Sequence, residues 1–222
     1  MNFGLSFSYI FKDQDWFKKL LIPALCMLIP IVGWMVSLGW ALKVARNVMD
    51  GVEEPLPELD FGGDILRGFF AFLISFIYSL PVSILSSISG WISNWQFTNN
   101  ETALFGMGLV TAVIGLISFA LGLVTTFLSL GAIANYIGKD DFGAAFRLGE
   151  VWRLVTANIG DWLLVLVGML IAVGLIGPLG TIACIIGVIL TMTYGLAVTG
   201  HMLGQAYVGA QKKMTPTVEP VD

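Results

Sequence analysis

A run of small residues at heptad spacing, set in a long apolar stretch, most constrains how this chain folds. Between residues 108 and 132 every first and fourth heptad position is small. The set is Gly108, Thr111, Gly115, Ser118, Gly122, Thr125, Ser129 and Ala132, with Leu, Val, Ile and Phe between them. A soluble coiled coil needs large apolar residues at these positions, whereas membrane helices associate where small side chains let backbones approach. We therefore expect a central transmembrane helix, held along its length by neighbours crossing at about 20°.

The composition also indicates a membrane protein. Of the 222 residues 57% are apolar and only 12% are charged, against about 25% in a soluble domain. Mean hydropathy is +0.87. The net charge of −4 gives no reason to expect a nucleic-acid partner, and two cysteines inside apolar runs do not predict a disulfide framework.

The basic residues predict the membrane topology. The apolar stretch from Trp16 to Val48 is too long for one span of about 20 residues and short for two. All basic residues fall on one side of the membrane if the chain forms a hairpin with its turn at 30–33, a span from about 68 to 89, a polar loop over 90–102, and a second hairpin turning at 177–180. These are Lys12, Lys18, Lys19, Lys43, Arg46, Arg67, Lys139, Arg147, Arg153, Lys212 and Lys213. The positive-inside rule makes that side cytoplasmic.

The predicted fold is therefore an all-α, polytopic bundle of about six membrane helices, two hairpins flanking a central pair, with both termini cytoplasmic. Residues 1–208 form one transmembrane domain and 209–222 a disordered cytoplasmic tail. The first arms of the hairpins, 16–29 and 162–176, are roughly 21 to 24 Å long against a core of about 30 Å, so they either cross a thinned bilayer or re-enter.

Two segments are predicted to be amphipathic helices in the membrane plane. In residues 1–12, Phe3, Phe7, Ile10 and Phe11 share one face, and residues 140–158 place their apolar side opposite Arg147, Glu150 and Arg153. The second segment could instead dock a partner helix. Both segments begin with F-G-x-x-F and lead to Asp-Trp and a hairpin. This similarity suggests a parallel repeat of units 1–50 and 140–208, joined by 64–138.

Three polar features are candidate sites. The loop from Asp50 to Asp64 is acidic and is expected to anchor the next helix, with Asp64 as its cap, rather than to bind a cation. Ser75, Ser79, Ser83 and Ser86 form a stripe that lines a pathway or, more ordinarily, bonds to helix backbones. His201 lies within G-x-x-x-G (Gly200 and Gly204), where the glycines indicate close helix packing and the single histidine is a candidate pathway residue.

The motifs of several enzyme classes are missing. The sequence has no G-x-S-x-G, Walker loop, G-x-G-x-x-G, H-E-x-x-H or paired Cys/His spacing, and no charged residue near the centre of a predicted span. We expect no catalytic activity, cofactor or metal. A lipid-handling enzyme would have only the acidic loop to support it.

Several short motifs resemble those of one uncharacterised family. They are Phe11-Lys12-Asp13-Gln14-Asp15-Trp16, Gly39, Arg46, Gly51, Leu56-Pro57-Glu58, Gly68, Ala145-Phe146, and Gly200 with Gly204. Over nearly its whole length the chain is similar to the prokaryotic membrane proteins grouped as the domain of unknown function DUF4013. The resemblance implies a six-helix type of integral membrane protein in the cytoplasmic (inner) membrane of a prokaryote, and it brings no activity, substrate or site residues.

Two functions from different classes follow as expectations. One is a non-catalytic scaffold or accessory subunit that contacts membrane lipids and binds another membrane protein or itself through its small-residue faces. The other is a facilitative transporter of a neutral or amphipathic solute. An interior cavity bordered by Ser79, Ser83 and His201 would favour transport.

Overall fold

A computed structural model describes residues 1–94 and 101–215, and every regular element in these ranges is helical. The elements in chain order are α1 (Phe3–Ser8), η1 (Tyr9–Lys12), α2 (Trp16–Cys26), α3 (Val32–Met49), α4 (Phe61–Asn94), α5 (Glu101–Lys139), η2 (Phe142–Phe146), α6 (Leu148–Ala157), α7 (Ile159–Met169), η3 (Leu170–Ile176), α8 (Gly177–Leu179), η4 (Gly180–Ala183) and α9 (Cys184–Met214). The predicted all-α fold class is confirmed.

The centre of the molecule is the pair α3 and α9, which pack against each other along much of α3. Buried Ala41, Val44 and Ala45 of α3 lie against Gly200 and Gly204 of α9. The first half of α4, the last turns of α5, and α6 and α7 complete the same core. We call this part of the molecule the bundle.

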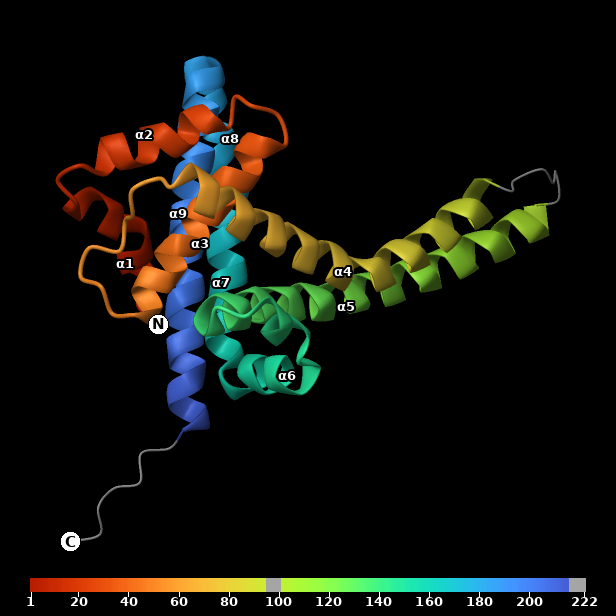
Figure 1. The fold of residues 1–222 in the computed structure, drawn as a ribbon. Helices are drawn as coiled ribbons and strands as arrows, with labels where there is room; N and C mark the ends of the chain where they lie inside the picture. The colour runs from red at the N-terminus through yellow and green to blue at the C-terminus, as the bar shows by residue number, and fades with distance from the viewer. Residues whose placement is uncertain (95–100, 216–222) are drawn as a thin grey trace, which may run out of the picture.

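The rest of α4 and α5 leaves the bundle as a long paired arm. In Figure 1 the two helices run side by side, across the direction of α9, to a tip far from the other elements. We define the arm as residues 79–94 and 101–127. Over 79–92 and 105–127 its side chains are largely exposed, and large apolar residues such as Leu116 and Phe119 are 70% and 69% exposed. Exposed apolar surface of this extent indicates contact with lipid or protein.

A second hairpin is formed by the stretch from α7 to η4 and by the start of α9 (Figure 1). Within its first limb η3 is π-helical, a wide form that is rare and usually short. The chain reverses at Cys184, whose φ is +60°, a few residues after the turn predicted at 177–180. Pro178 sits in the first turn of α8, where its missing N–H costs no hydrogen bond.

Four stretches are long and apolar enough to cross a membrane. They are Phe61–Ile92, Phe105–Lys139, Ile159–Ile182 and Ile186–Met214. The chain is thus a membrane protein by composition and helix length, and α2 and α3 are not among these four. With 11 residues, α2 is only about 16 Å long, so it falls well short of a core of about 30 Å.

Two predictions about single segments were wrong, and a third is only partly described by the structure. Residues 1–12, predicted to be an amphipathic helix in the membrane plane, form α1 and η1, which pack on α9 and bury Ser6, Tyr9 and Ile10, while Phe11 is exposed. Residues 90–94 and 101–102, predicted to be loop, extend α4 and α5. Residues 209–214, predicted to be disordered, continue α9, because Ala210 is buried and Gln211 donates to the Tyr207 hydroxyl. Residues 216–222 lie outside the described residues.

Candidate functional site

A close backbone contact in the bundle lies at Gly200 and Gly204, where α9 crosses α3. A Cβ on Gly200 would overlap the carbonyl oxygen of Ala41, and one on Gly204 would lie 2.6 Å from that of Ala45. This is the kind of backbone approach that G-x-x-x-G spacing allows. The two glycines are therefore part of the helix-packing core, with no room for a larger residue.

The small-residue seam of α5 has a different environment. A Cβ on Gly108, Gly115 or Gly122 would have no atom of another described element within 4 Å. Among the described elements only α4 accompanies the arm, so no helix of the described part of this chain packs on these three positions. Thr111 and Thr125 bond to carbonyls of their own helix, and Ser118 has a buried Oγ without a hydrogen-bond partner among the described residues. Of the seam, Ala132 is buried in the core of the bundle.

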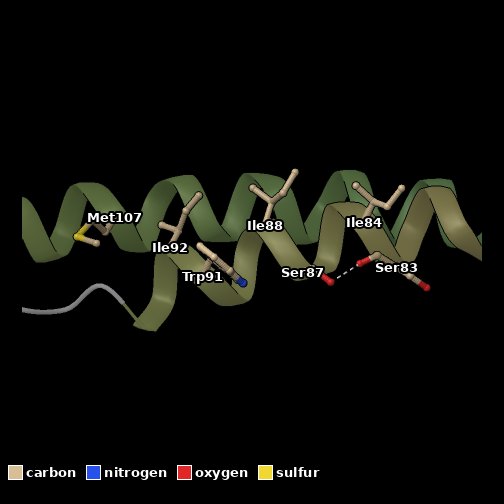
Figure 2. Close-up of a pocket in the computed structure, with 7 residues that line it drawn as sticks. All are labelled: Ser83, Ile84, Ser87, Ile88, Trp91, Ile92 and Met107. Carbon is tan, nitrogen blue, oxygen red and sulfur yellow. Dashed lines mark hydrogen bonds between the residues drawn. The ribbon is translucent and has the colours of Figure 1, made fainter.

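An apolar groove of about 620 Å³ runs along the arm (Figure 2). Ile84, Ile88 and Ile92 of α4 follow one another along it, and Met107 of α5 closes one end. The serines beside them are turned to the helix backbone, since Ser87 Oγ donates to the Ser83 carbonyl at 2.8 Å. The groove therefore presents hydrocarbon rather than free hydroxyl groups.

A second cavity, of about 310 Å³, lies where the arm joins the bundle, and we call it the junction cavity. Its lining includes Ser75 and Ser79 of the predicted stripe and Thr125 and Ser129 of the seam. Ser83 lies on the arm groove instead. The structure thus divides the predicted serine stripe between two surfaces.

His201 faces a third pocket, also about 310 Å³, at the other side of α9. The ring is 5% exposed and stacks on Tyr9, with centroids 4.2 Å apart. Its Nδ1 lies 2.8 Å from the Gln205 amide nitrogen and 3.0 Å from Ser6 Oγ. Because an amide nitrogen can only donate, Nδ1 acts as the acceptor and the neutral ring carries its proton on Nε2.

The same network fixes α1 against α9. The Tyr9 hydroxyl donates to the Ala197 carbonyl at 3.1 Å, and burial raises the pKa of Tyr9 well above its usual range, so the phenol keeps this proton. Gln205 also accepts from the backbone N–H of Asn2 at 2.6 Å. The polar groups around His201 are therefore occupied in holding α1 in place. A continuous pathway through Ser79, Ser83 and His201 is not formed.

The pocket at His201 is closed by the acidic loop, with Glu53 and Glu54 at its edge. Three donors of α3 bind the backbone of this loop: Trp40 Nε1 to Pro57, Lys43 Nζ to Glu58 and Asn47 Nδ2 to Pro55, at 2.9 to 3.0 Å. Among the described residues no group of acidic, His and Cys side chains could hold a metal ion. The geometry matches an anchoring loop.

Asp64 ties the start of α4 to α3 and is fully buried. Its carboxylate accepts from Arg67 at 2.8 Å and from Lys43 at 3.3 Å, and from the backbone N–H of Asp60 at 2.8 Å, just before the helix begins. These charge-assisted bonds satisfy a buried carboxylate that would otherwise be costly. Asp64 therefore both caps α4 and joins it to α3.

Other helix ends meet in the same region. Arg46 of α3 donates to the carbonyl of Ile137 at 2.7 Å, at the C-terminal end of α5, where a cation is favoured by the helix dipole. Lys139 pairs with Glu150 of α6, and Lys213 donates to Asn158 at 2.8 Å. Hydrogen bonds from Lys139 and Asn135 lower the pKa of Glu150. The polar face of α6 is thus part of a charged cluster.

A comparison with known protein families identifies the family of this chain. The model of a protein family of unknown function, DUF4013, matches residues 22–192, most of the sequence. The chain belongs to the DUF4013 family. No curated protein and no solved structure matches it. For this DUF4013 protein, any function therefore has to be argued from its own residues.

Sequence reasoning missed the partners of His201, namely Ser6, Tyr9 and Gln205. The aromatic stripe of residues 1–12 drew attention to Phe3 and Phe7, which only border the core. The available signal was the spacing of two hydrogen-bonding residues, Ser6 and Tyr9, at i and i+3. Nothing in the spacing, however, indicates that the partner of Ser6 lies 195 residues away.

Proposed function

We propose that this DUF4013 protein is a non-catalytic membrane scaffold or accessory subunit, and that its arm binds transmembrane helices of another membrane protein or of a second copy. One observation carries the proposal: α5 keeps a row of small residues over many turns of the arm, yet among the described elements only α4 accompanies it. Small residues on a membrane helix favour close helix association. In the bundle, by contrast, the closely packed glycines contact other helices of the same chain.

The distribution of charged and apolar side chains supports a membrane topology for this protein. The ends of α3, α4, α5 and α9 are tied together by charged side chains, whereas Trp91, in the far part of α4, and Ile182, just before the turn into α9, are 73% and 85% exposed. We propose that the charged cluster and both termini lie in the cytoplasm. Three hairpins, formed by α2 and α3, by α4 and α5, and by α7 to α9, then enter the bilayer from that side. Because α2 is short, the first hairpin re-enters rather than crosses.

Cross-linking in native membranes tests the scaffold. In a variant with Cys26 and Cys184 replaced by serine, Gly115→Cys is expected to form adducts with a neighbouring helix, and an added Gly108→Leu change is expected to abolish them. Ala120→Cys is the matched control, since it is equally exposed on α5 but about 140° around the helix. Equal adduct yields at both cysteines, or none at either, would contradict the proposal.

A facilitative transporter of a neutral or amphipathic solute is the second candidate, because the junction cavity includes Ser75 and Ser79. The absence of Ser83 and His201 from that cavity weakens it. Reconstituted vesicles loaded with a fluorescent phospholipid provide the test. Faster loss of fluorescence to an external quencher with wild type than with Ser129→Phe would support transport, and identical rates would exclude it for this solute.

A further inference from the structure

The junction cavity is enclosed by elements that are far apart in the sequence. Trp34 and Leu38 come from α3, Leu130 from α5 and Leu196 from α9, while Ser75 lies on α4. Met169 and Val173, at the end of α7 and in the π-helical η3, complete the wall. The cavity thus exists only because the arm and the α7–α9 hairpin diverge at this point.

Most hydroxyl groups of the lining are already used as donors within their own helices. Ser79 donates to Phe76, Thr126 to Gly122 and Thr199 to Gly195, at 2.7 to 2.8 Å, and Thr125 also donates to Gly122, at 3.1 Å. The Tyr78 hydroxyl donates to the Ala145 carbonyl at 2.7 Å. A polar solute would find few free donors here and would lose its own hydrogen bonds to water. The occupant that fits is therefore apolar.

Charge leads to the same conclusion. None of the residues lining the junction cavity is acidic, basic or histidine. Three of the membrane-length stretches, Phe61–Ile92, Phe105–Lys139 and Ile186–Met214, contribute walls, and the fourth contributes Met169 and Val173. A void with such walls opens toward hydrocarbon, and an empty apolar cavity loses the dispersion contacts that a chain of methylene groups restores.

We propose that the junction cavity binds one acyl chain of a bilayer lipid. Ser75 and Ser129, the two lining hydroxyls without a hydrogen-bond partner among the described residues, leave room for one polar group of that lipid. The bound chain fills the space between the arm and the bundle. This inference does not depend on the scaffold function, because the cavity is formed within a single chain and the arm's seam glycines lie outside it.

Photolabelling of the purified full-length protein tests this inference. In detergent, with a few molecules of a phosphatidylcholine carrying a photoreactive acyl chain per protein, label is expected on cavity peptides that contain Met169 or Leu196. Ser129→Phe, which fills the cavity, is expected to lower that labelling about tenfold, the equivalent of about 1.4 kcal/mol of affinity. The matched control is Ser87→Phe, which adds the same ring to the open arm groove and is expected to leave cavity labelling unchanged.

A second test uses a smaller substitution and does not depend on the folding of Ser129→Phe. In a background without Cys26 and Cys184, Ser129→Cys is expected to react with an apolar maleimide at least several-fold more slowly when phosphatidylcholine is added, while Ser87→Cys is slowed much less. Equal protection of the two cysteines, or label spread evenly over arm and cavity peptides, would overturn the assignment. Loss of arm cross-links at Gly115→Cys with intact cavity labelling would remove the scaffold function and leave this inference standing.

Discussion

The bundle and the arm use the same small residues in opposite ways. In the bundle, Gly200 and Gly204 sit against the carbonyls of Ala41 and Ala45. In the arm, Gly108 and Gly115 have open space where a side chain would be. Of the most apolar 18-residue windows, 61% is buried in α9 and none in α5. Small residues thus permit a close approach, and whether one occurs depends on which helices the fold brings together.

A matched pair of alanine substitutions should give the largest difference between the two regions. Gly200→Ala is expected to destabilise the protein by about 3 kcal/mol, because the new methyl group overlaps backbone that cannot move without separating α3 from α9. Gly115→Ala is expected to change stability by no more than about 0.5 kcal/mol. Denaturant unfolding in detergent, followed by circular dichroism, measures both. Similar losses of stability in the two variants would show that the glycines of the bundle and of the arm are not packed differently.

Asp64→Asn should have the next largest effect, since it removes the charge that holds Lys43 and Arg67 at the start of α4. Both cations are partly exposed, so we expect about 2 kcal/mol rather than the 3 to 5 of a fully buried pair. Asp50→Asn is the control, because its pair with Arg46 lies on the surface and is worth about 0.5 kcal/mol. The same unfolding measurement applies, and equal effects would show that the arm is not anchored through Asp64.

The packing of α1 on α9 belongs to the closely packed bundle, and its contribution to stability can be measured by a double-mutant cycle. Ser6→Ala and His201→Ala each remove the contact between Ser6 Oγ and Nδ1, so their effects should not add, with a coupling of about 1 kcal/mol. Faster amide exchange in residues 3–12 should accompany either change. Strict additivity would show that the two side chains do not hold α1 together.

The smallest effect concerns pH and belongs to the junction of α5 with α6. Because the pKa of Glu150 is lowered in the folded state, its contribution to stability is present above its unfolded pKa of about 4.3 and is lost as the pH falls through the folded value. Glu150→Gln should therefore flatten the acid limb of a stability curve below about pH 5. Glu58→Gln, on the acidic loop, is the control, and an unchanged limb in Glu150→Gln would contradict the assignment.

Particular residues show how far the sequence could be used for prediction. Gly200 and Gly204 indicated a close crossing, and the pattern of 140–158 placed Val151 and Val155 on the buried side of α6. In residues 1–12 the aromatic stripe was visible, but the contact of Ser6 with His201 of α9, which fixes the segment, was not. The serine stripe was visible as a pattern, but its division between the arm groove and the junction cavity was not.

The sequence by itself determined that the chain is helical and built for a membrane, because long apolar runs can satisfy their backbone hydrogen bonds only within helices. It also marked where helices can touch, since a missing side chain is a local property. Tertiary structure alone decided which glycines are covered, which hydroxyls face a cavity, and that the arm leaves the bundle. Those outcomes depend on contacts between residues more than a hundred positions apart, which no local pattern encodes.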